Sequence, residues 1–188
     1  LIIGVVLGSR IFEILFYQPA YYFTNPLKMV AIWQGGLSFH GGLVGACIAT
    51  FLFCRKRNFS FFVFADMIVL PAALALGLGR LGNFLNGELF GRVTSVPWAV
   101  KFQNADGFRH PSQLYESFKN FFIFVTLWIL KDTKRKPGFL FALFLILYGS
   151  LRFLVEFVRE PEVIIFSLTM GQWLSIPLIV VGIFLLKK

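Results

Sequence analysis

A short polar stretch, Gly79–Arg92 (GRLGNFLNGELFGR), follows a long apolar run and interleaves two arginines, two asparagines and one glutamate with glycines. The forked donors of an arginine such as Arg80 match the oxygens of a phosphate. Asparagine amides supply donors and acceptors, and glycines allow backbone N–H groups to approach an anion. The stretch therefore predicts a binding site for a phosphate-bearing anion, with a polar turn at the end of a membrane span as the alternative.

Ionisable side chains also occur inside apolar stretches, in pairs at helical spacing. The pairs are Arg10 with Glu13, Glu116 with Lys119, and Arg152 with Glu156. Residues three or four apart share one helix face, and charges within lipid usually face a bundle interior or a wet cavity. Self-neutralising pairs that hold helices together are favoured for Glu116–Lys119, whereas function and helix pairing are about equally supported for Arg152–Glu156. The lone Asp66 is expected to hydrogen-bond a neighbouring helix.

A histidine flanked by glycine pairs, His40 in Gly35–Gly42 (GGLSFHGG), begins another apolar stretch. Because histidine ordinarily titrates near about pH 6.5, a neutral imidazole there is a candidate base for an incoming nucleophile. A packed histidine bonded to a carbonyl is the alternative from these residues alone. The other histidine, His110, precedes Pro111 in a polar loop and is expected to have a positioning role.

The composition indicates which elements position these groups. Of the 188 residues, 57% are hydrophobic and 14% are charged, whereas soluble domains have about 45–50% and about 25%. Six apolar stretches hold the excess: Leu1–Tyr17, Leu37–Cys54, Phe61–Gly79, Leu114–Leu130, Phe139–Val158 and Met170–Leu186. A helix of about 20 apolar residues crosses a bilayer, and the runs do not alternate as barrel strands do. We expect an all-α polytopic transmembrane bundle, with residues 1–188 forming a single integral membrane domain.

Basic clusters between the stretches predict the orientation. They follow the second, fourth and sixth stretches, at Arg55–Arg57, at Lys131 with Lys134–Lys136, and at Lys187–Lys188. Cytoplasmic loops carry such an excess of lysine and arginine, so one alternating topology places all three clusters in the cytoplasm. The polar loop region 80–113 then faces the extracytoplasmic side, and within it residues 96–102 are expected to form a short strand or an interfacial segment. Because the net charge of +9 is divided among these clusters, no nucleic-acid partner is expected.

No metal site is expected, because histidine and cysteine do not cluster at ligand spacing. The chain begins with Leu1 inside an apolar stretch instead of with Met. We therefore expect that the chain is a fragment or processed chain that lacks upstream sequence.

Five motifs, in order along the chain, resemble those of the bacterial prolipoprotein diacylglyceryl transferase family. Besides Gly79–Arg92 and Gly35–Gly42, they are RHPSQLYE at Arg109–Glu116, YGSLRFLVEFVREPE at Tyr148–Glu162 and MGQWLSIP at Met170–Pro177. The resemblance covers nearly the whole chain. The family has one span more than the six stretches found here.

The resemblance implies an integral enzyme of the bacterial plasma (inner) membrane whose active site opens toward the extracytoplasmic side. It would move the diacylglyceryl group of phosphatidylglycerol, a membrane lipid, onto the thiol of the lipobox cysteine in a prolipoprotein signal peptide. A thioether forms, and glycerol phosphate leaves. No metal or organic cofactor is implied.

The implied catalytic residues are His40, Arg80, Arg152 and Glu88. A thiol with an ordinary pKa of about 8.5 must become a thiolate before it attacks, and His40 is the candidate base. Arg80 and Arg152 would stabilise charge that grows on the oxygens of the leaving phosphate. Glu88 would hold an arginine in place or take part in proton transfer.

The implied substrate-binding residues are Arg80, Asn83, Asn86, Gly91, Arg152 and Glu156. Asn83 and Asn86 would orient the headgroup, and Gly91 would give backbone room. Glu156 would hold the arginines in place or take part in proton transfer.

Two other classes of function stay open. An anion transporter or lipid flippase also uses intramembrane arginines and glycine-rich breaks, although the chain has no internal repeat and its polar motifs gather at the outer ends of the stretches. Another lipid-headgroup enzyme, such as a membrane acyltransferase, would attach acyl chains without the glycerol unit.

Overall fold

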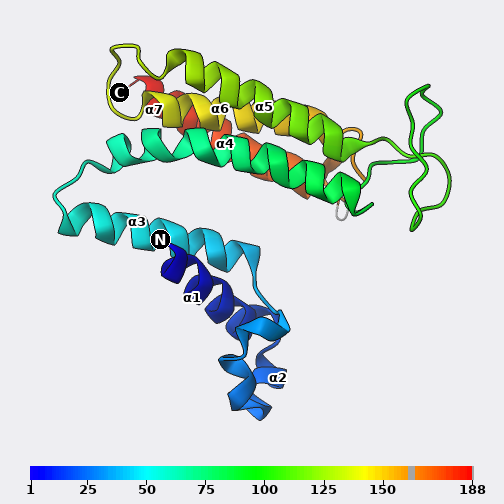
Figure 1. The fold of residues 1–188 in the computed structure, drawn as a ribbon, viewed down its shortest axis with the longest axis horizontal. Helices are drawn as coiled ribbons and strands as arrows, with labels where there is room; N and C mark the ends of the chain where they lie inside the picture. Colours follow the sequence, from blue (N-terminus) through cyan, green and yellow to red (C-terminus); the bar gives the residue numbers. More distant parts are fainter. Residues whose placement is uncertain (161–163, 188) are drawn as a thin grey trace. The chain divides into compact units, whose positions relative to one another are not determined.

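The computed structural model describes residues 1–160 and 164–187, without the side chains of Gln34, Phe39, His40 and Ile165. The chain divides into two compact units, Leu1–Phe64 and Ala65–Lys188, and each is described by itself. Helices dominate both units (Figure 1). The expected all-α class is therefore confirmed, with a short β-hairpin added in the second unit.

The α-helices are α1 (Ile2–Phe12), α2 (Pro19–Thr24), α3 (Phe39–Lys56), α4 (Phe61–Leu85), α5 (Ser112–Leu130), α6 (Phe139–Val155) and α7 (Met170–Lys187). The shorter elements are a π-helical turn (Glu13–Tyr17), two 3-10 turns (Pro26–Met29 and Ile32–Gln34) and the strands β1 (Ile164–Ile165) and β2 (Leu168–Thr169). Each of the six apolar stretches in the sequence thus contains a helix. By length and composition α4 and α7 qualify as membrane spans, and α6 is a shorter apolar helix.

The first unit is built on α1 and α3, which meet through glycines. A methyl group added to Gly4 would lie 2.8 Å from the carbonyl oxygen of Gly45, and one added to Gly8 would lie 2.8 Å from the Cα atom of Gly45. Gly8 also faces Gly41, so the two helices run antiparallel with interlocking glycines. Small residues four apart on each helix allow two backbones to touch in this way.

Arg10, near the end of α1, anchors the loop that leads to α3. Its guanidinium donates hydrogen bonds to the carbonyl oxygens of Gly35 and Gly36, both at 2.7 Å, and to the hydroxyl of Tyr22 at 3.1 Å. Among the described residues, no ion pair joins Arg10 to Glu13, so the pairing expected from their spacing is corrected. A buried guanidinium needs acceptors for all five of its donors, and the loop carbonyls supply more of them than one carboxylate.

The second unit is a bundle in which α4, α5, α6 and α7 lie side by side (Figure 1). Its apolar core is formed by Val69 and Ala73 of α4, Ile123 and Leu127 of α5, and Leu140 of α6. Burial of this core holds the helices that carry the polar groups described below.

Glycines bring α6 and α7 into close contact. A methyl group added to Gly149 would lie 3.0 Å from the carbonyl oxygen of Ser175, and one added to Gly182 would lie 2.8 Å from that of Ala142. The two helices therefore pack backbone against backbone.

Asp66 of α4 caps the start of α6. Its carboxylate accepts hydrogen bonds from the backbone N–H groups of Gly138 at 2.7 Å and Phe141 at 2.8 Å. Gly138 is the N-cap residue of α6 and has no side chain of its own, so a neighbouring helix supplies the acceptor that the first turn needs. The hydrogen bond expected between Asp66 and a neighbouring helix is confirmed.

The segment between α4 and α5 is held by isolated β-bridges. Val93 and Val100 each pair with Arg109, and Gly91 pairs with Arg159 in the segment after α6. In the described part of the stretch that was expected to form a strand or an interfacial segment, Val100 alone forms a bridge. Helix α4 continues to Leu85, so the first residues of the expected loop region are helical.

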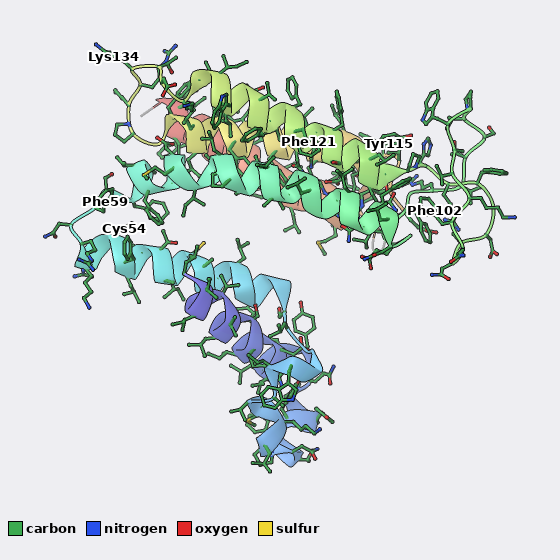
Figure 2. All side chains as sticks on the ribbon, in the orientation of Figure 1. Cys54, Phe59, Phe102, Tyr115, Phe121 and Lys134 are labelled. Atoms are coloured by element: carbon green, nitrogen blue, oxygen red, sulfur yellow. The ribbon has the colours of Figure 1, made fainter. Side chains whose placement is uncertain are left out.

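An aromatic cluster holds this segment against the end of the bundle. Phe102 is buried, and its ring stacks on that of Phe90 with the centroids 5.3 Å apart. Figure 2 shows Phe102 and Tyr115 near the end of the bundle from which the segment extends.

A β-hairpin leads into α7. Strand β1 pairs antiparallel with β2 across a turn at Phe166 and Ser167, whose φ angles of 48° and 65° suit a two-residue hairpin. The backbone N–H of Thr169 then donates to Gln172 Oε1 at 2.9 Å, and the N–H of Gln172 donates to Thr169 Oγ1 at 3.3 Å. This reciprocal cap fixes the start of α7.

Candidate functional site

A buried carboxylate on α5, that of Glu116, is the centre of a cluster of charges. Lys119 Nζ lies 3.0 Å from its Oε2 atom, and Arg80 Nε lies 3.8 Å from the same oxygen. Arg152 Nη1 pairs with Oε1, and Arg159 Nη1 lies 3.7 Å from that oxygen. Four cations therefore reach one carboxylate from α4, α5, α6 and the segment after α6. We call these residues, together with Glu156, the charge cluster.

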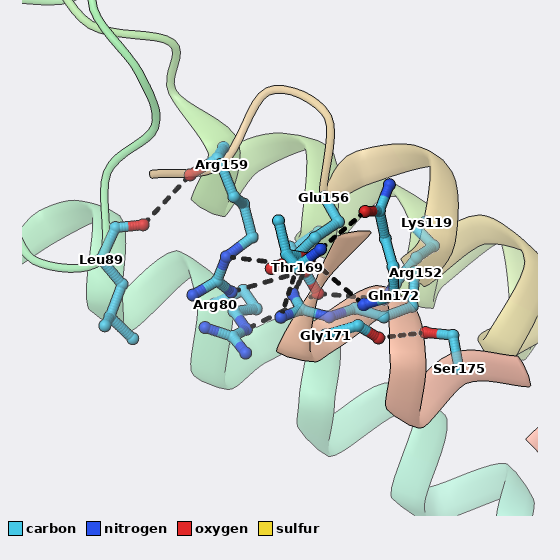
Figure 3. Close-up of polar contacts among 12 residues, drawn as sticks. Arg80, Leu89, Lys119, Arg152, Glu156, Arg159, Thr169, Gly171, Gln172 and Ser175 are labelled. Atoms are coloured by element: carbon cyan, nitrogen blue, oxygen red, sulfur yellow. Dashed lines mark hydrogen bonds and ion pairs between the residues drawn. The ribbon is translucent and has the colours of Figure 1, made fainter. Parts of the chain in front are cut away.

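Glu156 supplies the second carboxylate of the charge cluster. Its Oε2 atom lies 2.8 Å from Arg152 Nη2, as an ion pair without the geometry of a hydrogen bond, and 3.7 Å from Arg159 Nε. A methyl group added to Gly171 would lie 2.6 Å from the carboxylate carbon of Glu156. The carboxylate thus rests on the first turn of α7, where the helix dipole stabilises a negative charge. Figure 3 shows these contacts in close-up.

The charge cluster carries an excess of two positive charges, because four cations face two carboxylates. Buried charges are costly unless they are balanced, so the cluster favours an additional anion. The side chains of Arg80 and Arg152 are 23% and 16% exposed, whereas that of Lys119 is 3% exposed. Arg80 and Arg152 are therefore the most exposed of the four cations, with Arg159 next at 12%, and Lys119 balances Glu116 from within.

Arg159 is held in the charge cluster through its backbone. Arg92 Nε donates a hydrogen bond to the carbonyl oxygen of Arg159 at 2.8 Å, and the next residue, Glu160, accepts one from Arg109 Nη1 at 2.7 Å. Burial lowers the pKa of Arg159, and the positive charge of Arg152 lowers this pKa further. An anion beside Arg159, in addition to Glu116 and Glu156, would offset both effects.

Two asparagines and one glutamate form a second cluster at the end of α4. Asn83 Nδ2 donates to Glu88 Oε1 at 2.9 Å, and Asn86 Nδ2 reaches the same oxygen at 3.4 Å. Gly87, with a φ angle of 68°, makes the turn that brings Glu88 back toward the helix. We call Asn83, Asn86 and Glu88 the amide cluster. Asn83 lies three residues after Arg80 and therefore on the same face of α4.

Gln113, in the first turn of α5, connects the two clusters. Its Nε2 atom donates a hydrogen bond to the backbone carbonyl of Glu88 at 2.7 Å. Gln113 is 1% exposed and lies three residues before Glu116. The amide cluster therefore lies one helical turn beyond the contact between Arg80 and Glu116.

Gly91 has a packing role in the structure. A methyl group at this position would lie 2.8 Å from His110 Cβ and would overlap the carbonyl oxygen of Val158. The room at Gly91 is therefore taken by the chain itself, because the backbone of this segment touches its neighbours on two sides.

The two histidines lie in different units. His40 belongs to the first turn of α3, which is N-capped by the Ser38 hydroxyl, and its side chain lies outside the described residues. His110 Nδ1 lies 3.2 Å from the hydroxyl of Tyr115, to which Trp98 Nε1 donates a hydrogen bond at 2.7 Å. His110 thus helps to fix the loop that contains Trp98, as expected for a residue with a positioning role.

The structure brings Arg80, Arg152 and Glu156 together, as their residue types and depth suggested. Glu88 lies with the asparagines of the amide cluster, and within the described part of the chain no arginine side chain pairs with it. Residue type and spacing alone give no functional role to Glu116, Lys119 or Arg159. Two of the family-like motifs contain Glu116 and Arg159, and that position was the available signal.

Comparison with known proteins finds one family model and a set of relatives that cover nearly the whole chain. The profile described as prolipoprotein diacylglyceryl transferase matches residues 1–187. A Bordetella parapertussis protein is 50% identical over 188 residues, which cover 96% of this chain and 72% of that protein. A Polynucleobacter asymbioticus protein is 47% identical over all of this chain and 74% of its own length. A Nitratidesulfovibrio vulgaris protein is 47% identical over 99% of this chain and 73% of its own length. All three are named phosphatidylglycerol–prolipoprotein diacylglyceryl transferase.

Proposed function

This chain belongs to the prolipoprotein diacylglyceryl transferase family, and from that premise we propose that it transfers the diacylglyceryl group of phosphatidylglycerol to a prolipoprotein. The acceptor is the thiol of the lipobox cysteine in the signal peptide. The products are a thioether-linked prolipoprotein and glycerol phosphate. The enzyme is a transferase of the bacterial membrane and acts in lipoprotein biosynthesis.

The observation that carries this proposal is the approach of Arg80 and Arg152 to one buried carboxylate within a cluster that has excess positive charge. Their guanidiniums come from α4 and α6 and keep part of their surface exposed. An anionic headgroup that entered the second unit would meet both. Arginine forks suit phosphate oxygens better than lysine does, because they donate two hydrogen bonds in fixed geometry.

The reaction forms a sulfur–carbon bond and breaks a carbon–oxygen bond. The cysteine thiolate attacks the glyceryl carbon that carries the phosphate ester, and the electron pair of the broken bond goes to the phosphate oxygen. The phosphodiester has one negative charge and the departing monoester gains a second. Arg80 and Arg152 stabilise that developing charge. The thiol gives its proton to a base, for which His40 is the candidate.

The remaining residues hold this arrangement. Glu116 and Glu156 keep the arginines in place between turnovers. Asn83 and Asn86 orient the headgroup from the amide cluster, and Glu88 fixes their amides through the shared Oε1 atom.

The proposed setting is the inner membrane, with all six helical stretches crossing the bilayer. The apolar helices α4 and α7 support a membrane setting, and the basic clusters at Arg55–Arg57, Lys131–Lys136 and Lys187 favour a cytoplasmic side opposite to the charge cluster. The site then opens toward the extracytoplasmic side.

The test is transfer of label by the full-length protein in vesicles. Phosphatidylglycerol labelled in its glyceryl backbone is supplied with a peptide that contains a lipobox cysteine, and the peptide mass is measured. A gain equal to the diacylglyceryl group supports the proposal. A gain of acyl chains alone indicates an acyltransferase, and movement of lipid between leaflets without any thioether indicates a flippase; either result contradicts the proposal.

A further inference from the structure

The side chain of Gln113 carries a buried acceptor without a donor. Among the residues that the structure describes, its Oε1 atom has no hydrogen-bond partner and is shielded from solvent. The amide cannot be reversed, because its Nε2 atom donates to the carbonyl of Glu88 and an oxygen in that place would face another oxygen. A buried acceptor left unpaired is unfavourable, so the position favours a group that donates a hydrogen bond.

Gln113 lies on the same face of α5 as Glu116, one turn before it and on the side of the amide cluster. The charge cluster, where the phosphate would bind, begins one turn along α5 at Glu116, and the amide cluster contacts Gln113 through Glu88. One helical turn is about 5.4 Å, which is similar to the reach of a glycerol unit beyond its phosphate. A headgroup whose phosphate is held by Arg80 is therefore long enough to reach Gln113.

We propose that Gln113 is a specificity-determining residue that accepts a hydrogen bond from a hydroxyl of the glycerol headgroup. This inference rests on the proposed function and adds to it the group that recognises the headgroup. Phosphate oxygens and acyl esters of the lipid have no hydrogen to donate, whereas the terminal glycerol has two hydroxyls. A headgroup of equal charge without hydroxyls leaves Oε1 unpaired, and the site rejects it.

The experiment compares two lipids that differ only in those hydroxyls. Transfer by the full-length protein in vesicles is measured with phosphatidylglycerol and with phosphatidylpropanol, and the ratio of the two kcat/KM values is the readout. We expect the unmodified protein to prefer phosphatidylglycerol by at least about tenfold, the effect of one buried acceptor left unpaired. Gln113→Leu should reduce that preference to less than about threefold.

Two further variants separate recognition from folding. Gln113→Glu, protonated at this buried position, donates its O–H to the Glu88 carbonyl in place of Nε2 and keeps an acceptor oxygen, so it should retain the preference, whatever its total activity. Asn120→Leu removes another buried amide, two turns further along α5, whose Oδ1 atom is also without a partner among the described residues. It should leave the ratio unchanged.

The outcomes distinguish this inference from the proposed function. Equal use of the two lipids by the unmodified protein, or an unchanged ratio in Gln113→Leu, overturns the role of Gln113. Loss of the preference in Gln113→Glu overturns the role of Gln113 as well. If neither lipid supports transfer by the unmodified protein, the proposed function itself fails.

Discussion

Arg80 and Arg152 contact opposite oxygens of one carboxylate. Arg80 Nε lies 3.8 Å from Glu116 Oε2, while Arg152 Nη1 pairs with Oε1. The two guanidiniums come from α4 and α6, so three helices share one ionic contact. A phosphate that bound there would exchange partners with Glu116, because the arginines are already held close together.

Replacement of Arg80 tests the phosphate contact. Arg80→Ala should reduce transfer by at least about a hundredfold, which is typical when one donor to a developing oxyanion is removed. Arg80→Lys should recover little of this loss, because an ammonium lacks the fork of donors. The initial rate of thioether formation, normalised to the amount of protein in the membrane, gives the result. Near-normal rates in both variants would remove Arg80 from the site.

Neutralisation of Glu116 tests the charge balance. Glu116→Gln leaves four cations with one carboxylate, so the free energy of unfolding should fall by about 3 kcal/mol, as when one partner of a buried ion pair is removed. The midpoint of thermal unfolding in detergent measures this change. Glu160→Gln is the matched control, because Glu160 is exposed and its pair with Arg109 should contribute less than about 1 kcal/mol. A loss in the control as large as that in Glu116→Gln would contradict the central place of Glu116.

Removal of one hydroxyl tests how the loop after α4 is held. Tyr115→Phe deletes the group that joins Trp98 and His110, so the indole should become more mobile and its fluorescence should shift. We expect transfer to fall by about threefold, near the net value of one hydrogen bond. Tyr21→Phe, at an exposed tyrosine of the first unit, is the control. An unchanged Trp98 signal would show that this contact does not order the loop.

Loss of the cap on α6 tests the role of Asp66. Asp66→Ala should lower the free energy of unfolding by about 1–2 kcal/mol, the usual effect of deleting an N-cap acceptor. Asp132→Ala changes an exposed carboxylate in the neighbouring loop and should have little effect. The difference between the unfolding midpoints of the two variants is the measurement. Equal midpoints would mean that water replaces the Asp66 carboxylate at no cost.

The sequence predicted the groups at the site better than their partners. Arg80 could be recognised from the glycine-rich polar stretch in which it lies. Arg152 could be recognised because charges within apolar helices must meet other polar groups, and Asp66 bonds a neighbouring helix for the same reason. Spacing along one helix predicted the Glu116–Lys119 and Arg152–Glu156 pairs, which form at 3.0 and 2.8 Å.

The contacts that the sequence did not predict are contacts between different helices and loops. Arg10 turns to loop carbonyls instead of Glu13, since the loop folds back over the end of α1. Glu116 becomes the centre of the charge cluster only because α4, α5 and α6 approach one another there, and spacing within a single helix does not encode that approach. The packing at Gly91 depends on Val158 and His110, which are distant in the sequence.

The hydrogen bonds that join Asp66 to the start of α6 also fix the axial position of α6 relative to α4. Asp66 joins the start of α6 at Gly138, and fourteen residues separate Asp66 from Arg80, just as fourteen separate Gly138 from Arg152. At a rise of 1.5 Å per residue, each arginine lies about 21 Å along its helix from the contact between Asp66 and Gly138. Insertion or deletion of a single residue in α4 or α6, between the contact and the arginine, would shift one guanidinium along the helix axis and rotate it away from the other. Length, and not sequence alone, is therefore under constraint in these two helices.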